Sequence, residues 1–117
     1  MKRLFFFLLA LFSMTAFAQN TATLGWTAPT TYTDGTPITE ALTYQVYQGV
    51  GAGSTKAKVG TPLAGTTRTI STGLLGGRVY CWQVSTVAAS GESALSNEAC
   101  KTFPQAPPSA PSGLSAQ

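Results

Sequence analysis

The chain has 117 residues and little charge, with seven lysines and arginines, four acidic residues and no histidine. This length suits one small domain. The absence of histidine excludes an imidazole base, a Ser-His catalytic pair and histidine metal ligands. The four carboxylates are scattered, and no two of them stand in a motif typical of an acid/base pair. The composition therefore predicts a protein that is not an enzyme and that needs no cofactor and no metal.

Residues 1–18 have the pattern of a secretory signal peptide. Lys2 and Arg3 supply the positive start, and residues 4–12 are apolar. Residues 16–18 (Ala-Phe-Ala) give the small-x-small motif that precedes a cleavage site. The apolar run is shorter than the roughly 20 residues of a transmembrane helix, and the motif disfavours an uncleaved anchor. We therefore expect a secreted or periplasmic protein with no membrane contact after cleavage.

The mature chain is predicted to be one domain, residues 19–103, followed by a proline-rich tail, residues 104–117. Removing 18 residues from 117 leaves 99, with five basic and four acidic side chains and a net charge of +1. The basic isoelectric point of the full chain thus comes partly from the signal peptide. It does not indicate a nucleic-acid partner.

The apolar residues of the mature chain follow the two-residue period of β-strands and show no helical period. Ala22, Leu24 and Trp26 alternate with polar residues and predict a half-buried strand. Residues 30–41 contain an Asp-Gly pair and have no apolar period, so we expect a long loop there.

The middle of the chain predicts three more strands. The first ends at a glycine-rich turn, residues 49–54. Residues 56–63 form a weak polar strand, whose lysines suit the edge of a sheet. A short strand is expected within residues 67–72. The inward face of the first of these strands comprises Leu42, Tyr44 and Val46.

Residues 74–103 predict a long β-hairpin. Ser90-Gly91 supplies its turn, since glycine readily takes a positive φ. If these two residues are the whole loop, Cys81 lies directly opposite Cys100, at a spacing that a disulfide can span. A bulged turn would shift this register by one residue. One face of the first strand of the hairpin carries Tyr80, Trp82 and Val84.

The two cysteines, Cys81 and Cys100, are expected to form one disulfide. Small exported proteins fold in oxidising compartments, where paired cysteines form such bridges. With 18 residues between them, loop closure predicts about 3 kcal/mol of stabilisation.

Short strands with turn signals about every 8–12 residues are typical of an all-β sandwich. Four motifs stand in order along the chain: Leu24-x-Trp26, Asp34-Gly35-Thr36-Pro37-Ile38, Tyr44-x-Val46-Tyr47, and the spacing of Leu74, Tyr80, Val84 and Gly91. Together they resemble the fibronectin type III family over residues 21–103. The resemblance implies an immunoglobulin-like β-sandwich with Tyr80 in the tyrosine-corner position. It places Tyr80, Trp82 and Val84 in the core and leaves Cys81 on the outer face.

The chain departs from this family in three respects. Gly76 stands where the family often has proline, and the approach to the third strand is extended by a few residues. The mature chain also leaves little room for a first strand. In the tail, residues 110–117 look like the opening of a type III module. This segment could return to its own sheet, add to the sheet of a neighbour and build an oligomer, or be idle.

The resemblance implies that the loop after the second strand and the loop after the sixth lie at one pole of the domain. Residues 31–37 and 90–93 would then form one polar surface. The candidate binding residues are Tyr32, Thr33, Asp34, Gly35, Ser90, Gly91 and Glu92.

Other side chains that could carry chemistry have simpler interpretations. Asp34 is too isolated for a cation site, and an Asx-type turn is expected instead. Trp26 and Trp82 are expected in the core and not in a sugar-stacking platform. Tyr32 and Tyr47 are better candidates for exposed aromatics.

We expect an exported, non-catalytic binding module that recognises a protein or glycan at a cell or virion surface. The alternative is a structural spacer or assembly unit linked through its C-terminal segment. The family resemblance implies a bacterial or phage source.

Overall fold

The computed structural model describes residues 20–117, and the predicted signal peptide lies outside them. The described chain is all-β, with seven strands and no helix. No helix in residues 20–117 is therefore long and apolar enough to cross a membrane. The strands are β1 (Ala22–Gly25), β2 (Thr43–Val50), β3 (Ala57–Leu63), β4 (Thr67–Ile70), β5 (Arg78–Ala88), β6 (Gly91–Glu92) and β7 (Ala99–Phe103).

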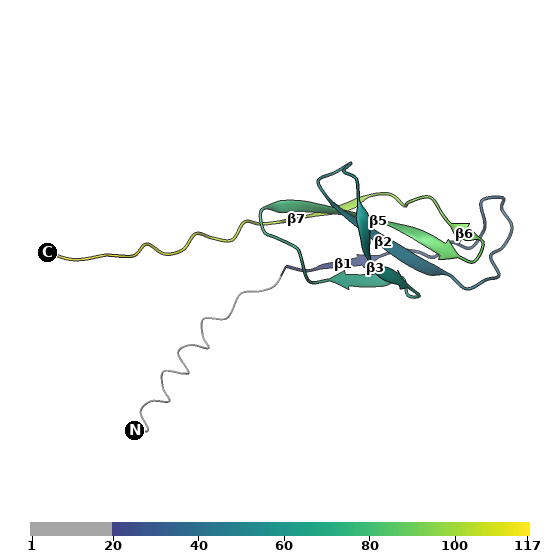
Figure 1. The fold of residues 1–117 in the computed structure, drawn as a ribbon, viewed down its shortest axis with the longest axis horizontal. Helices are drawn as coiled ribbons and strands as arrows, with labels where there is room; N and C mark the ends of the chain where they lie inside the picture. The colour runs from purple at the N-terminus through teal and green to yellow at the C-terminus, as the bar shows by residue number, and fades with distance from the viewer. Residues whose placement is uncertain (1–19) are drawn as a thin grey trace, which may run out of the picture.

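The strands form two antiparallel sheets (Figure 1). The smaller sheet pairs β1 with β4, and the larger sheet has the order β3-β2-β5, with β6 and β7 both paired to the far edge of β5. Because β6 and β7 follow one another along that edge, they act as one interrupted strand. The polar strand predicted at a sheet edge is confirmed, since β3 pairs with β2 alone.

The two sheets share one apolar core. Alternation along each strand turns every second side chain inward, so both sheets contribute to it. Two antiparallel sheets that enclose a common core are consistent with the predicted β-sandwich. The buried core residues are Ala22 and Ile70 from the smaller sheet, Val46, Tyr80, Trp82 and Phe103 from the larger sheet, and Leu74 from the connection before β5.

Both tryptophans contribute to the core, as predicted. Trp82 is buried and Trp26 is half-buried against the core cluster. The ring of Trp26 lies 5.6 Å from the ring of Tyr44, and the ring of Tyr80 lies 6.4 Å from that of Trp82. The core position of both indoles argues against a sugar-stacking platform made of tryptophan.

The predicted turn of the hairpin is wrong by one residue. Ala88 pairs with Gly91, so the two loop residues are Ala89 and Ser90. Gly91 does take a positive φ, of 137°, but at the first paired position after the loop. The positive φ of Gly91 was predicted correctly, but the prediction that Gly91 belongs to the two-residue loop was wrong.

The predicted pairing of Cys81 with Cys100 is confirmed. The two residues are directly opposed in the ladder of β5 and β7, and their sulfur atoms are bonded. Paired residue numbers sum to 179 near the turn and to 181 along β7. The irregular segment between β6 and β7 therefore contains two more residues than the opposite stretch of β5, and this insertion restores the register that the cysteines require.

Cys81 is not solvent-exposed, although the family resemblance places it on the outer face. It lies on the face opposite to Tyr80 and Trp82, yet its exposed fraction is 0%. The segment after β2 folds back over this face: a Cβ at Gly49 would lie 2.6 Å from Oγ of Ser54. Gly49 pairs directly with Cys81. The glycine thus allows the turn to cover the cysteine.

The outer face also holds a buried glutamine. Gln45 is 3% exposed and lies where the pairing of β2 with β3 shifts register. Its Nε2 group is 3.1 Å from the carbonyl oxygen of Val46, 3.4 Å from that of Val59 and 3.2 Å from that of Gly60. A polar side chain can be buried here because it donates to carbonyl groups that the irregular ladder leaves open.

The tail does not complete the sheet of its own domain. Residues 104–117 form no strand, and Figure 1 shows them running away from the body of the molecule. Leu114 is 97% exposed. The alternative in which residues 110–117 return to their own sheet is therefore not the arrangement in this structure. Pairing with a neighbour stays a prediction.

Candidate functional site

The two predicted binding loops meet at one end of the molecule. The carboxylate of Glu40 accepts hydrogen bonds from the hydroxyl groups of Tyr32, at 2.8 Å, and Ser90, at 2.7 Å. Tyr32 lies in the loop between β1 and β2, and Ser90 lies in the turn between β5 and β6. We call this end, residues 29–42 and 88–96, the loop pole. Glu40 fixes its two parts to one another.

The first part of the loop pole is a compact turn. Thr31 and Pro37 form an isolated antiparallel bridge, and the N–H of Tyr32 donates to the carbonyl oxygen of Thr36 at 2.8 Å. Oδ1 of Asp34 accepts from the backbone N–H of Thr36 at 2.9 Å and from its hydroxyl group at 2.7 Å. The predicted Asx-type turn is confirmed. These bonds also lower the pKa of Asp34.

The second part of the loop pole uses serine hydroxyl groups in place of backbone carbonyls. The N–H of Thr86 donates to Oγ of Ser93, and the N–H of Val84 donates to Oγ of Ser96, each at 2.9 Å. The N–H groups of the same serines return bonds of 2.8 Å to the carbonyl oxygens of Thr86 and Val84. Each serine therefore holds the irregular segment against β5 where no regular strand forms.

Glu92 is anchored on the outer face of β5. Its carboxylate accepts from the hydroxyl groups of Ser85 and Tyr47, each at 2.5 Å. These bonds lower the pKa of Glu92, and the carboxylate in turn raises the pKa of Tyr47. Tyr47 is half-buried, so its ring is less available than the sequence predicts.

A groove of about 490 Å³ opens at the loop pole. Its floor continues the inward faces of β2 and β5, because β1 ends at Gly25 and leaves the far end of the core uncovered. The apolar lining is Pro29, Ile38, Leu42, Val84, Ala88 and Ala94. Most of the remaining lining residues carry hydroxyl groups: Thr27, Thr31, Tyr32, Thr33, Thr86, Ser90, Ser93 and Ser96; Gly91 and Glu92 complete the lining.

Five of the seven predicted binding residues line this groove: Tyr32, Thr33, Ser90, Gly91 and Glu92. Asp34 and Gly35 do not, because they form the tip of the turn. Sequence reasoning missed the apolar floor. Leu42 was predicted on the inward face of its strand and Val84 in the core; Val84 does pack against the core, whereas Leu42 lies before β2 and lines the groove. The alternation of inward and outward residues along a strand does not reveal whether the opposite sheet covers its inward face at this end.

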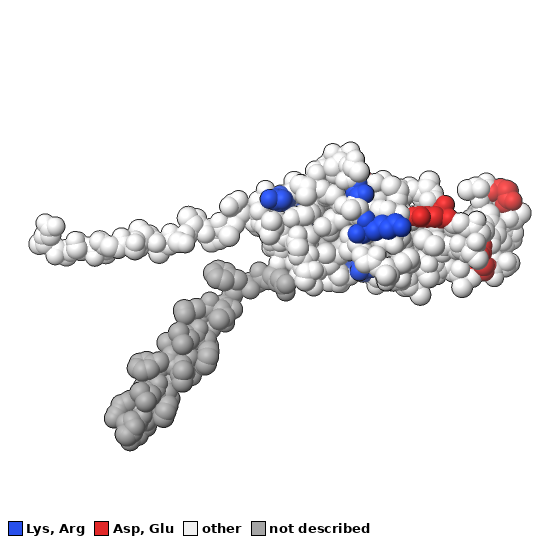
Figure 2. Space-filling view, viewed as in Figure 1, with Lys and Arg blue, Asp and Glu red and all other residues white. Residues whose placement is uncertain are grey.

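The loop pole is acidic. It contains Asp34, Glu40 and Glu92, and neither lysine nor arginine lines the groove. Figure 2 shows carboxylates at this end and basic side chains over the middle and the tail side of the body. Hydrogen bonds from Ser90 and Tyr32 lower the pKa of Glu40. The carboxylates are therefore anionic at neutral pH.

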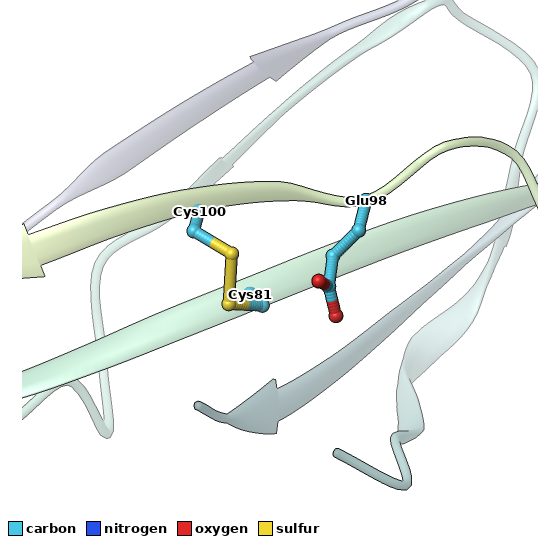
Figure 3. Close-up of side chains that lie close together, drawn as sticks. All are labelled: Cys81, Glu98 and Cys100. Carbon is cyan, nitrogen blue, oxygen red and sulfur yellow. A yellow bond between two sulfur atoms is a disulfide. The ribbon is translucent and has the colours of Figure 1, made fainter. Parts of the chain in front are cut away.

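Glu98 lies beside the disulfide on the same side of the sheet (Figure 3). The two sulfur atoms are bonded to each other and offer no thiolate to a metal. The carboxylate of Glu98 pairs with the ammonium group of Lys56 and accepts from the N–H of Gly53. These bonds lower the pKa of Glu98. This cluster fastens the covering turn over Cys81 and is not a ligand set.

A scan against protein-family models finds no match for this chain, and a search of the curated proteins finds none either.

Proposed function

We propose that this protein is an exported, non-catalytic binding module with a fibronectin type III-like fold. In this proposal the groove at the loop pole holds part of a protein or glycan surface. The observation that carries the proposal is the pair of bonds that Glu40 accepts: the bond from Ser90 joins the two loops, and the bond from Tyr32 fixes Glu40 within its own loop. A preformed groove on fixed loops is typical of binding modules.

The strand order supports the family. In immunoglobulin-like sandwiches the third, sixth and seventh strands form one sheet and the second and fifth lie in the other. The order β2-β5-β7 against β1-β4 corresponds to that division. Tyr80 adds a local feature: its hydroxyl group accepts from the N–H of Leu75 at 2.9 Å and donates to the carbonyl oxygen of Gly73 at 3.3 Å. A tyrosine that bonds to the backbone upstream of its strand is the tyrosine corner of this fold.

The lining of the groove favours a protein ligand over a glycan. Sugar sites present broad aromatic faces, whereas both tryptophans contribute to the core and the aromatic residue of the groove, Tyr32, is half-buried and bonded to Glu40. The groove combines an apolar floor with a hydroxyl-rich rim and an acidic surround. Such a surface suits an apolar side chain flanked by basic or neutral groups.

The experiment compares arginine substitutions at two exposed alanines, one in the groove and one outside it. Ala94 is exposed and lines the groove, and Ala52 is exposed in the turn over the disulfide. The probes are a displayed peptide library and a glycan array. We expect peptides selected by the wild-type protein to lose binding to Ala94→Arg and to retain it with Ala52→Arg. Equal loss in both variants, selection of glycans alone, or no selection at all would contradict a peptide-binding groove.

The non-catalytic part of the proposal has its own test. Homogeneous protein is assayed against glycoside, ester and peptide substrates, with Glu92→Gln as a control for activity that depends on the loop pole. We expect no turnover above buffer. Turnover that copurifies with the protein and falls in a loop-pole variant would establish an enzyme.

A further inference from the structure

Among residues 20–117, the smaller sheet has a free edge along β1. The N–H of Trp26 donates to the carbonyl oxygen of Thr66 at 3.0 Å, in register with the pairing of Leu24 and Arg68. Hydrogen-bonded pairs alternate in an antiparallel ladder, so even-numbered residues of this strand bond to β4. The N–H and C=O groups of Thr21, Thr23 and Gly25 therefore point away from β4. Within residues 20–117 no strand pairs with this edge.

A narrow slot of about 280 Å³ lies beside this edge, between β1 and β7. Leu24 and Trp82 contribute apolar surface to it, and Lys101 lies on its β7 side. The Nζ group of Lys101 donates to the carbonyl oxygen of Thr21 at 2.8 Å, which confirms that this carbonyl faces the slot. The slot has the two properties of an incomplete sheet: an open hydrogen-bonding edge and an adjoining apolar surface.

The tail is chemically complementary to the slot, because it offers an uncharged segment with an exposed apolar side chain. It carries no charge, and its one large apolar side chain, Leu114, is 97% exposed. Among the other large hydrophobic residues of the described chain the exposed fraction does not exceed 54%. Small residues flank the leucine: Ser112, Gly113, Ser115 and Ala116.

The start of the tail directs it away from its own domain. The N–H of Gly77 donates to the carbonyl oxygen of Phe103 at 2.7 Å, and a Cβ at Gly76 would lie 2.7 Å from the carbonyl oxygen of Pro104. The tail thus leaves β7 packed against this glycine pair. Prolines at 104, 107, 108 and 111 keep the following segment extended. A reversal into the slot of the same molecule would have to occur within that stiff segment.

We propose that residues 112–117 of one copy pair with the free edge of β1 in a second copy and place Leu114 in its slot. The pairing is antiparallel, as is every strand pair of this protein. Leu114 lies opposite Leu24, since directly opposed residues point to the same face. The hydrogen-bonded pairs are then Gly113 with Gly25, Ser115 with Thr23, and Gln117 with Thr21, whose carbonyl oxygen has a second lone pair for the bond from Lys101.

The registers one residue to either side, and the register two residues toward Ala22, fail for stated reasons. A shift of one residue turns Leu114 to the solvent face. A shift of two, with Leu114 opposite Ala22, places Pro111 opposite Gly25, where an N–H is needed and proline has none. Gly113, which has a φ of 76°, must become extended in the complex, and a glycine does so readily.

This contact joins two different surfaces and therefore builds a head-to-tail chain or a closed ring. It goes beyond the proposed ligand site, because the slot and the loop pole share no residue. The module would then be an assembly unit that presents repeated binding poles.

The experiment mixes two variants of the exported protein, Thr23→Cys and Ser115→Cys, under mild oxidation. Because each variant carries one added cysteine, a 23–115 disulfide can form only between copies, and hydrogen-bonded neighbours lie within disulfide reach. We expect this heterodimer to form at least several-fold faster than the one from Thr23→Cys with Ser109→Cys. Equal rates would overturn the proposed register and the pairing.

Solution size provides the second measurement. We expect the wild-type protein to grow in apparent mass with concentration and Leu114→Asp to stay monomeric with an unchanged circular dichroism spectrum. A wild-type protein that is monomeric at all concentrations would refute the assembly. A double variant with both cysteines that closes within one chain at high dilution, with no dimer, would show that the tail serves its own domain. Ala94→Arg should not alter assembly, so this test and that of the ligand groove fail separately.

Discussion

Cys81 is a fully buried sulfur on the outer face of a sheet, and its partner Cys100 lies on an exposed strand. Two features protect the bond. The turn after β2 packs over Gly49, and the ion pair of Lys56 with Glu98 fastens that turn. The covalent link reinforces the ladder between β7 and β5 next to the slot.

We predict that the protein contains no free thiol and that replacing both Cys81 and Cys100 with serine destabilises it. In the loop-closure account the lost constraint is worth about 3 kcal/mol in the free energy of unfolding. Urea unfolding of the double variant measures the loss, and thiol titration of the unreduced, denatured protein tests the bond. Two reactive groups per chain would disprove the disulfide.

The ring of Trp26 is well packed, but the N–H group of its indole is buried without a hydrogen-bond partner among the described residues. Its ring packs against Tyr44 and the core, but its Nε1 group is buried and has no hydrogen-bond partner in residues 20–117. Trp82, in contrast, donates to Oε1 of Gln48 at 2.8 Å. The two indoles thus differ in how much of their bonding capacity the fold satisfies.

We predict that Trp26→Ala lowers the free energy of unfolding by about 3 kcal/mol, because a large aromatic contact is lost. Trp26→Phe should cost much less, since it keeps a ring and removes an unpaired N–H, whose burial costs about 1–3 kcal/mol. Urea unfolding of both variants gives the comparison. A loss below about 1 kcal/mol in Trp26→Ala would mean that the ring contributes little to the core and would revive the sugar-platform interpretation.

At the scale of elements, the hairpin illustrates what a sequence pattern can and cannot predict. The two-residue period correctly placed Tyr80 and Trp82 on one face of the strand, because parity is a local property of a strand, and the family resemblance correctly assigned that face to the core. The position of the turn was wrong by one residue. The disulfide was nevertheless correct, because the inserted residues before β7 restore the register. The inserted segment is held to β5 by serine hydroxyl groups that accept hydrogen bonds in place of backbone carbonyls. The periodicity of the sequence does not reveal this arrangement.

The same distinction applies to the two loops of the loop pole. Their joint location was predicted from the family resemblance, and the Asx-type turn was predicted from the residues at positions 34–36. The role of Glu40 was not predicted. Its partners are 8 and 50 residues away in the sequence, so only the folded arrangement brings them within hydrogen-bond distance.

We predict that Glu40 makes the stability of the loop pole depend on acid pH. Hydrogen bonds from Ser90 and Tyr32 lower its pKa below the ordinary value of 4.5. A carboxyl group with a lowered pKa in the folded state stabilises that state above its unfolded pKa. The contribution is lost as the pH falls from about 4.5 through the lowered value.

The measurement is the urea midpoint of the wild-type protein and of Glu40→Gln between pH 7 and pH 2. Since glutamine does not titrate, the variant should show a smaller loss of stability below about pH 4.5. Asp34, Glu92 and Glu98 also have lowered pKa values, so part of the acid dependence remains in the variant. Identical acid profiles would show that the bonds of Glu40 do not stabilise the fold.

At the scale of the whole molecule, the two sheets of residues 20–117 leave two places open. The groove at the loop pole exists because β1 is only four residues long, and the slot exists because no described strand covers the other edge of β1. The sequence analysis expected little room for a first strand, because the predicted cleavage site lies close to β1. It did not predict the groove, because the length over which two sheets overlap is set by packing between them.

The open edge leads to the last prediction, on thermal stability. If residues 112–117 of a neighbour complete the smaller sheet, folding is linked to association, and the free energy of unfolding increases with the concentration of the donor. We therefore expect the Tm of the protein to rise with protein concentration. Removal of residues 105–117 should abolish this dependence and leave the Tm of the dilute wild-type protein, because in a dilute monomer the slot is empty in both.

A synthetic peptide of residues 110–117 should raise the Tm of the truncated protein, and the same peptide with aspartate in place of Leu114 should not. A truncated protein that melts below the dilute wild-type protein would instead show that the tail stabilises its own domain. A Tm that is independent of concentration in the intact protein would mean that the free edge of β1 has no partner in solution.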